Sequence, residues 1–238
     1  MGAFITVLST AMLKDVRPDL VGLWSKLYSR SVRRIMFVSA HEYEDTSSIA
    51  ASFALLASER SDRPVWLIDI DLVGNPVFAM LDRGASDVIG RPGRAYDASL
   101  QSTDRIYEVS PLLSGASTHK LLTIHDLPGT NLFVTRMRSE YLKEGQTIAL
   151  RTGAAWWDTL RDVVAWAVID APPLGRSDGS LSVARDVDGI VIVVEADRTS
   201  ANDVRRAQDL LERAGGKVLG VVMDNVRKDA LRQAGLRR

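Results

Sequence analysis

The stretch at residues 33–67 decides the fold of this 238-residue chain, and it reads RRIMFVSAHEYEDTSSIAASFALLASERSDRPVWL. The apolar run at 35–38 predicts a strand. A polar turn follows at 39–48, and the spacing of Ile49, Phe53 and Leu56 predicts a helix that runs to about Glu59. A second continuous apolar run at 64–68 predicts a strand buried on both faces, as in a parallel sheet.

The turn at 39–48 lies where a nucleotide-binding P-loop would lie. Such a loop is rich in glycine and ends in Gly-Lys-Ser/Thr. Here the length and the position agree, but the turn contains neither glycine nor lysine. This mismatch between the position of the turn and its residues is the feature of the sequence that bears most directly on function.

The composition sets broad limits. The hydrophobic fraction is 46% and the charged fraction 25%, which suits one α/β domain with a full core. The formal net charge is zero, so no nucleic-acid partner is expected. Cysteine is absent, and no apolar run approaches the ~20 residues of a membrane span. Residues 1–13 do not read as a signal peptide, so we expect a cytoplasmic protein.

The rest of the chain alternates between strands and helices. Further strands are predicted at 132–135, 166–169, 189–194 and 218–223, and helices at 19–28, 156–164, 178–186 and 200–214; Pro18 or Asp19 would begin the first helix. The segment 82–130 is irregular, with short helices and one or two edge strands. This order predicts a doubly wound, mostly parallel α/β sheet. We expect an N-terminal extension at 1–32, the main domain at 33–226 and a basic tail at 227–238.

Three carboxylates follow the predicted strands. Asp69 and Asp71 end one strand and Asp170 ends another, at the sheet edge where α/β proteins place ligands. The alternative is structural, because such carboxylates also accept hydrogen bonds from helix N-terminal N–H groups. Of the histidines, His41 lies in the turn and could contact an anion. His119 and His125 are predicted to be surface or turn residues.

Residues 34–226 resemble the bacterial tyrosine kinases of polysaccharide export, which are deviant Walker P-loop ATPases related to the septum-positioning and partition ATPases. The matching motifs are AVIDAPP at 167–173 with Asp178, VDG at 187–189, Thr199, GVV at 220–222, and LIDIDL at 67–72. The resemblance implies a P-loop NTPase-like fold.

The Walker A turn departs from the family pattern Ser-x-x-Pro-Gly-Glu-Gly-Lys-Ser/Thr-Thr. Ser39, Glu44, Ser47 and Ser48 fit it, whereas Glu42 replaces the proline, Tyr43 and Asp45 replace the glycines, and Thr46 replaces the lysine. Glycines let backbone N–H groups approach the phosphates, and the lysine neutralises their charge. We therefore expect no ATP or Mg²⁺ cofactor and no confident catalytic residue.

The resemblance also implies a metal site that survives in part. In the family, positions equivalent to Ser47, Asp69 and Asp170 would hold Mg²⁺, with Asp71 beside them. Three other family features are missing. Val73-Gly74-Asn75 stands where an arginine follows the second acidic residue. Asp19, Gly22 and Ser25 replace the ring-forming Glu-x-x-Arg-x-x-Arg motif, and no tyrosine follows Tyr141.

The main functional hypothesis is a catalytically inactive relative of these kinases. It would serve a membrane polysaccharide co-polymerase or chain-length protein in the export of a capsule, exopolysaccharide or holdfast-type polysaccharide, recruited to the inner membrane by that partner, and could form homo-oligomers. One alternative is a divergent ATPase or kinase that binds ATP and Mg²⁺ with a cation from elsewhere, Arg136, Arg138 or Arg33-Arg34. Another is a partition-type ATPase that binds nucleic acid or membrane through the basic tail.

Overall fold

The computed structural model describes residues 10–42, 44–83, 90–102, 104–111, 121–151 and 155–224, with side chains from residue 20 onward. The elements in chain order are α1 (Thr10–Ser29), β1 (Arg34–Ser39), α2 (Thr46–Glu59), β2 (Val65–Asp69), α3 (Pro76–Asp82), β3 (Ala95–Asp97), β4 (Tyr107–Ser110), β5 (Leu122–Asp126), β6 (Leu132–Met137), the short 3₁₀ helix Ser139–Tyr141, β7 (Thr147–Leu150), α4 (Trp156–Val163), β8 (Trp166–Asp170), α5 (Gly179–Val183), the short 3₁₀ helix Ala184–Asp186, β9 (Gly189–Glu195), α6 (Ala201–Arg213) and β10 (Val218–Asp224).

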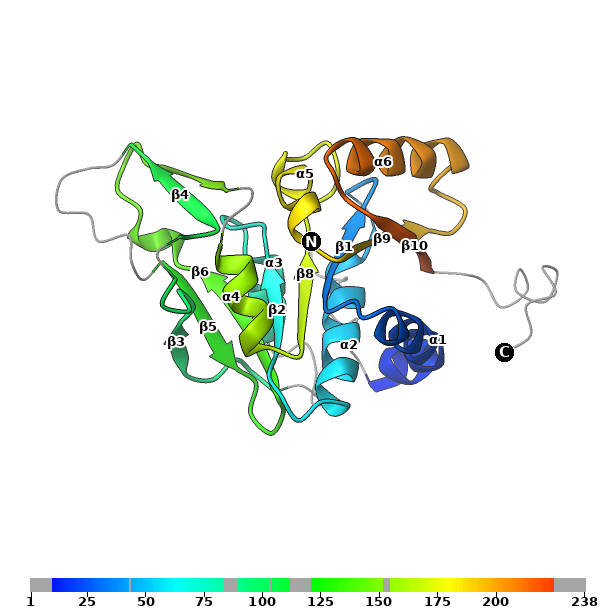
Figure 1. The fold of residues 1–238 in the computed structure, drawn as a ribbon, viewed down its shortest axis with the longest axis horizontal. Coiled ribbons are helices and arrows are strands. Elements are labelled where there is room, and N and C mark those ends of the chain that lie inside the picture. The colour runs from blue at the N-terminus through cyan, green and yellow to red at the C-terminus, as the bar shows by residue number, and fades with distance from the viewer. Residues whose placement is uncertain are drawn as a thin grey trace.

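Eight strands form one twisted sheet in the order β10-β9-β1-β8-β2-β6-β5-β3 (Figure 1). The neighbours from β10 to β6 are parallel, and only β5 and β3 join antiparallel. The helices α1, α2 and α3 contribute to the core on one face, and α4, α5 and α6 to the core on the other. The predicted doubly wound, mostly parallel α/β sheet is confirmed.

Burial explains why the central strands form here. Every residue of β1, β2 and β8 is buried, as expected for parallel strands covered on both faces. Phe53 of α2 contacts Phe37 and Trp166 on one face, with ring centroids 5.4 and 5.6 Å away. On the other face, Trp156 lies 6.1 Å from Trp66. The strand ends near the turn are therefore held on a rigid scaffold.

The first helix differs from its predicted start. It begins at Thr10 and continues through Pro18, because an internal proline costs a helix one backbone hydrogen bond without always ending it. Leu20 and Leu27 are buried in the same core as α2. The interpretation of 19–28 as a helix that packs on the domain holds for the described part of α1.

The region from α3 to α4 contains more helices and strands than were predicted. The sequence pattern missed the helix α3 and the strand β7. Of the three strands at 82–130, β3 is the edge of the main sheet, and β4 pairs with β7 in a separate two-stranded sheet. These strands are short and partly exposed, so they lack the continuous apolar runs that mark buried strands.

Candidate functional site

The carboxylates Asp69 and Asp170 lie side by side because β2 and β8 are parallel and these residues are register partners. Both are 3% exposed. Asp69 accepts hydrogen bonds from the backbone N–H groups of Asp71 and Val77, each at 3.0 Å. Asp170 accepts one from the Ser47 hydroxyl at 2.7 Å, and its Oδ1 is buried with no partner.

Burial changes the proton affinity of both carboxyls. Desolvation, supported by the charge of Asp170, raises the pKa of Asp69 well above its ordinary value. Desolvation also raises the pKa of Asp170 to about 7, with Asp45 and Asp71 adding repulsion while Ser47 opposes the shift. Without a bound cation, the two carboxyls therefore do not carry two full negative charges near neutral pH.

Asp71 is held by a residue that the sequence pattern did not single out. Its Oδ2 forms an ion pair with the guanidinium of Arg176, from the loop after β8, and its Oδ1 accepts a hydrogen bond from Gly74 N at 2.9 Å. A Cβ at Gly74 would lie 2.8 Å from Asp71 Oδ2, so glycine suits this tight turn. Arg176 is 105 residues from Asp71, and no local pattern links them.

The Walker A-like turn is held by Glu44, whose side chain is buried. One carboxylate oxygen accepts a hydrogen bond from His41 N at 3.1 Å, and the other accepts one from the Thr199 hydroxyl. These contacts join the turn to the loop between β9 and α6. The Glu44 carboxylate therefore fixes the turn.

The residues around Glu44 show what occupies the rest of the turn. Thr46, in the place of the family's lysine, is 5% exposed, and its hydroxyl has no partner. Asp45 is the N-cap of α2 but makes no side-chain capping hydrogen bond. Ser39 and Ser48 are buried, Glu42 is exposed, and Tyr43 lies outside the described residues.

The residues of the site therefore match a Mg²⁺–ATP site only in part. Ser47 and Asp170 are adjacent, as a P-loop metal site requires. Over the described part of the chain, however, no three carboxylate or imidazole groups converge to hold a metal ion. On the phosphate side, Thr46 cannot supply the cation, and Glu42 and Asp45 add two carboxylates that the family pattern lacks. The residues do not fit a triphosphate.

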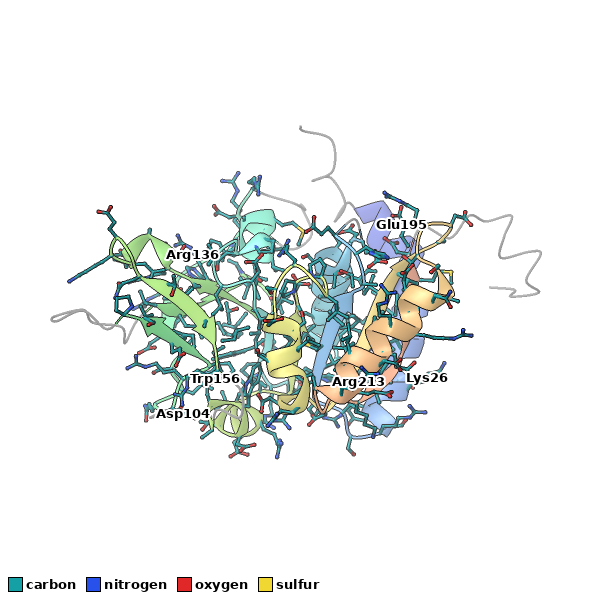
Figure 2. All side chains as sticks on the ribbon, turned by 90° about the horizontal axis from the view of Figure 1, so that it is seen from above. Lys26, Asp104, Arg136, Trp156, Glu195 and Arg213 are labelled. Atoms are coloured by element: carbon teal, nitrogen blue, oxygen red, sulfur yellow. The ribbon has the colours of Figure 1, made fainter. Side chains whose placement is uncertain are left out.

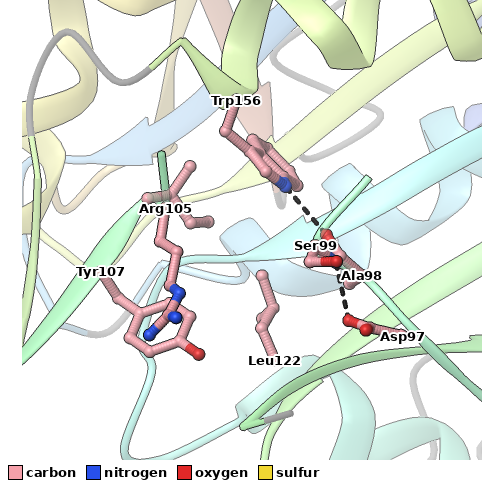
Figure 3. A pocket seen from close by; sticks show the side chains of 8 residues that line it. Asp97, Ala98, Ser99, Arg105, Tyr107, Leu122 and Trp156 are labelled. Carbon is pink, nitrogen blue, oxygen red and sulfur yellow. Dashed lines mark hydrogen bonds between the residues drawn. The ribbon is translucent and has the colours of Figure 1, made fainter. Parts of the chain in front are cut away.

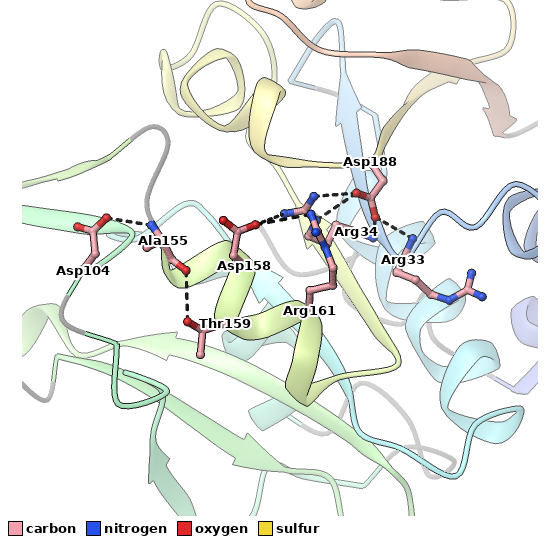
Figure 4. Close-up of polar contacts among 8 residues, drawn as sticks. All are labelled: Arg33, Arg34, Asp104, Ala155, Asp158, Thr159, Arg161 and Asp188. Carbon is pink, nitrogen blue, oxygen red and sulfur yellow. Dashed lines mark hydrogen bonds and ion pairs between the residues drawn. The ribbon is translucent and has the colours of Figure 1, made fainter.

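Arg33 and Arg34 were candidate replacements for the missing lysine, and the structure places them away from the turn of their own chain. They lie at the amino end of β1, whereas the turn follows its carboxyl end. The Arg34 guanidinium pairs with Asp188 at 2.8 Å and lies 3.9 Å from Asp158 (Figure 4). Asp188 also accepts hydrogen bonds from the backbone N–H groups of both arginines. This cluster ties β1 to the start of β9.

Arg136 and Arg138 lie at the carboxyl end of β6, next to β2 in the sheet. Arg136 pairs with Glu140 at 2.7 Å and lies on the side of the molecule far from Glu195 (Figure 2). The Arg138 guanidinium stacks 4.3 Å from the Tyr141 ring centroid, and its buried Nε has no hydrogen-bond partner. Among the described contacts, neither the Arg33 nor the Arg138 guanidinium pairs with a carboxylate, and of these two Arg138 is the one at the carboxyl edge of the sheet.

The histidine predictions are corrected in part. His125 lies in β5 and is 8% exposed, so its assignment to the surface or a turn is wrong. Its Nδ1 lies 3.1 Å from Gly93 O and its Nε2 3.3 Å from Thr123 Oγ1, which satisfies the ring inside the sheet. His41 is exposed in the turn, 3.5 Å from Asp203. His119 lies outside the described residues.

A small cavity lies away from this site, between the β3–β5 region and α4 (Figure 3). Its volume is about 10 Å³, room for about one water molecule. Trp156 Nε1 donates to Ala98 O at 2.8 Å beside it. The cavity is too small for a nucleotide.

Comparisons with known proteins agree with this fold. A ParA family model, described as NUBPL iron-transfer P-loop NTPase, matches residues 137–233. The tyrosine-protein kinase CpsD of Streptococcus agalactiae is 30% identical over 69 residues, 29% of this chain and 30% of CpsD. CapB of Staphylococcus aureus is 33% identical over 81 residues, 34% of this chain and 36% of CapB. The matches thus span about a third of these curated relatives.

Solved structures extend the likeness to most of the chain. The chimerical protein CapA2B2 matches with a TM-score of 0.58 at 19% identity, covering 88% of this chain and 84% of that one. The BceF tyrosine kinase domain gives 0.58 at 18%, covering 89% and 76%. A chain of the MinC:MinD cell division protein complex of Aquifex aeolicus gives 0.54 at 15%, covering 84% and 72%.

These findings define the class of protein first: a P-loop NTPase-like fold of the MinD and ParA type. The CpsD and CapB segments add a sequence similarity to tyrosine-protein kinases over about a third of the chain. In the described part of the chain, no helix is both long enough and apolar enough to cross a membrane.

Proposed function

We propose that this protein is a catalytically inactive member of the bacterial tyrosine kinase family, a pseudokinase that acts as a binding partner in polysaccharide export. The observation that supports this most directly is the chemistry of the altered turn. Thr46 replaces the cationic clamp, and Glu42 and Asp45 replace a proline and a glycine of the family pattern. A triphosphate brought here would meet carboxylates and no lysine.

Electrostatics supports the loss of activity. Two like charges at 4–6 Å repel by roughly 1 to a few kcal/mol, depending on the dielectric. The N-terminus of α2 attracts an anion by only ~0.3–1 kcal/mol per charge. Glu42 and Asp45 add two carboxylates to this turn relative to the family pattern, so we expect repulsion to outweigh the helix dipole.

The proposed partner is a membrane polysaccharide co-polymerase or chain-length protein, which would recruit the chain to the inner membrane from the cytoplasm. The likeness to CpsD, CapB and the CapA2B2 chimera supports this pathway. Export of a capsule, an exopolysaccharide or a holdfast-type polysaccharide would fit it. The intact scaffold beside an altered phosphate site favours docking over catalysis.

Two measurements test the proposal. We expect ATP hydrolysis no faster than a protein-free blank, with or without the cytoplasmic segment of the co-polymerase, and binding of that segment without nucleotide. Hydrolysis above the blank that Asp170→Ala abolishes would refute the proposed inactivity. Failure of the segment to bind would refute the partner but leave the inactivity standing.

A second candidate function is a divergent ATPase or kinase of the same pathway. The Ser47–Asp170 hydrogen bond and the guanidinium of Arg138 at the carboxyl edge favour it. A titration with a fluorescent ATP analogue and Mg²⁺ separates the two candidates. Saturation that Arg138→Gln weakens would support the enzyme, whereas no saturation at millimolar analogue would support the docking role.

A further inference from the structure

The two edges of the main sheet differ in how they are protected. β3 ends the sheet on one side with three residues, one of them Asp97. β10 ends it on the other side with seven residues, and no proline or charge lies between Val218 and Met223. Natural sheets usually shorten, charge or cover an edge strand to prevent pairing with another chain. β10 has the length and composition of an edge that pairs.

The outer part of β10 is apolar and accessible. Val221 is 47% and Met223 59% exposed. They are register partners of Ile192 and Val194 of β9, whose side chains belong to the core on the α6 face. A Cβ placed on Gly220 would meet nothing within 4 Å, so the backbone there is open to approach. Figure 1 shows β10 at the rim of the sheet, beside α6.

We propose that β10 pairs antiparallel with β10 of a second copy of this chain, which makes one sheet continuous across a two-fold axis. A two-fold interface brings the same strand of each copy together. With the axis through Val221, each Val221 faces its equivalent, and Gly220 faces Val222 of the second copy. Opposite residues of an antiparallel pair share a face, so the exposed valines meet on the α6 side.

The ends of β10 carry complementary charges in this register. The pairing of β10 with β9 is irregular between Val218 and Gly220, which places one extra residue there. If that extra residue is accommodated in the same way at the new interface, Val218 faces Met223 of the second copy, and Lys217 faces its Asp224. On each side of the two-fold axis at Val221, one apolar pair (Val218 with Met223) and one pair of opposite charges (Lys217 with Asp224) would then face each other across the interface.

This complementarity favours a second copy over an unrelated peptide. Self-pairing occupies the β10 edge of both copies at once, and among the described strands the other edge of the sheet is the three-residue β3, which offers little backbone for further pairing. The assembly therefore closes at two copies. The inference does not depend on whether the protein binds ATP.

Sedimentation equilibrium of the full chain across the micromolar range tests the pairing. We expect a monomer–dimer equilibrium whose dissociation constant rises by about tenfold or more in Val221→Lys, because two lysines would then face each other. Val163→Lys is the matched control, since Val163 is 41% exposed at the end of α4. The control should leave the equilibrium unchanged.

A charge exchange gives a second, independent measurement. Lys217→Asp and Asp224→Lys should each weaken the dimer, and the double variant should restore it. Circular dichroism confirms that each variant is folded. A wild type that stays monomeric throughout, or a dimer that Val221→Lys does not weaken more than Val163→Lys, would overturn the proposal. Single charge variants that fail to recover in combination would overturn the register.

Discussion

Replacing Asp170 with asparagine should stabilise the protein at alkaline pH and leave it nearly unchanged at acid pH. The carboxyl is 3% exposed, one of its oxygens has no partner, and its pKa is raised from 3.8 to about 7. Asparagine keeps the size and can still accept the hydrogen bond from Ser47. What it removes is the buried negative charge.

The sign and size follow from proton linkage. Between pH 3.8 and about 7, the folded protein holds a proton on Asp170 that the unfolded chain has released. The free energy of unfolding therefore falls as pH rises, by up to about 1.4 kcal/mol per pH unit. Over the full shift the loss is roughly 4 kcal/mol, complete above the folded-state pKa.

Urea denaturation between pH 5 and pH 8 measures this effect. We expect Asp170→Asn to exceed the wild type by roughly 4 kcal/mol at pH 8 and by only about 2 kcal/mol at pH 5, where less than half of the pH range between the two pKa values has been crossed. Asp62→Asn, at an exposed loop position, is the control for removal of one charge. A stability difference that does not change with pH, or an asparagine variant less stable than the wild type at pH 8, would refute the reasoning.

Two further changes probe the contacts around the turn. Glu44→Ala should lower the free energy of unfolding, measured by urea denaturation, by about 1–3 kcal/mol, because His41 N–H and the Thr199 hydroxyl lose a buried acceptor. The control is Glu42→Ala, which changes an exposed side chain and should have little effect. Equal losses of stability in the two variants would contradict the role given to Glu44. Arg176→Gln should extend the fall in the free energy of unfolding beyond pH 7, because the Arg176 charge lowers the pKa of Asp170 and its removal would raise that pKa further. Arg161→Gln, 52% exposed on α4, serves as the control, and an unchanged pH profile for Arg176→Gln would argue against this coupling.

Local pattern was enough to predict the centre of the fold. β1, β2, β8 and β9 are continuous apolar runs because both of their faces are covered, and no tertiary information is needed to see them. The end of α6 was likewise predictable, because Gly215 adopts φ +87° after the helix. Elements that are short or exposed on one face, such as α3 and β7, leave no such run.

The candidate site, like the fold, could be predicted from the sequence only in part. The adjacency of Asp69 and Asp170 was predictable, because parallel strands bring their carboxyl ends to one edge. The pairing of Asp71 with Arg176 was not, since it joins two loops that only the folded sheet brings together. The burial of His125 depends on β5, an antiparallel strand that the sequence pattern left inside an irregular segment. Long-range pairing therefore sets the limit of what sequence alone predicted here.

The two buried carboxylates bear differently on function. One oxygen of Asp69 accepts the backbone N–H of Asp71 in the β2–α3 turn and the other that of Val77 in α3, so these contacts give Asp69 a structural role whether or not the protein binds a nucleotide. Asp170 has one oxygen without a donor, and above its pKa its charge weakens the fold. No contact in the described structure requires that charge. If Asp170→Asn gains stability at pH 8 and still binds the co-polymerase segment, the charge is dispensable and docking explains the site. If the same variant loses saturable binding of an ATP analogue that the wild type shows, the charge serves a ligand, and the divergent enzyme is the better explanation.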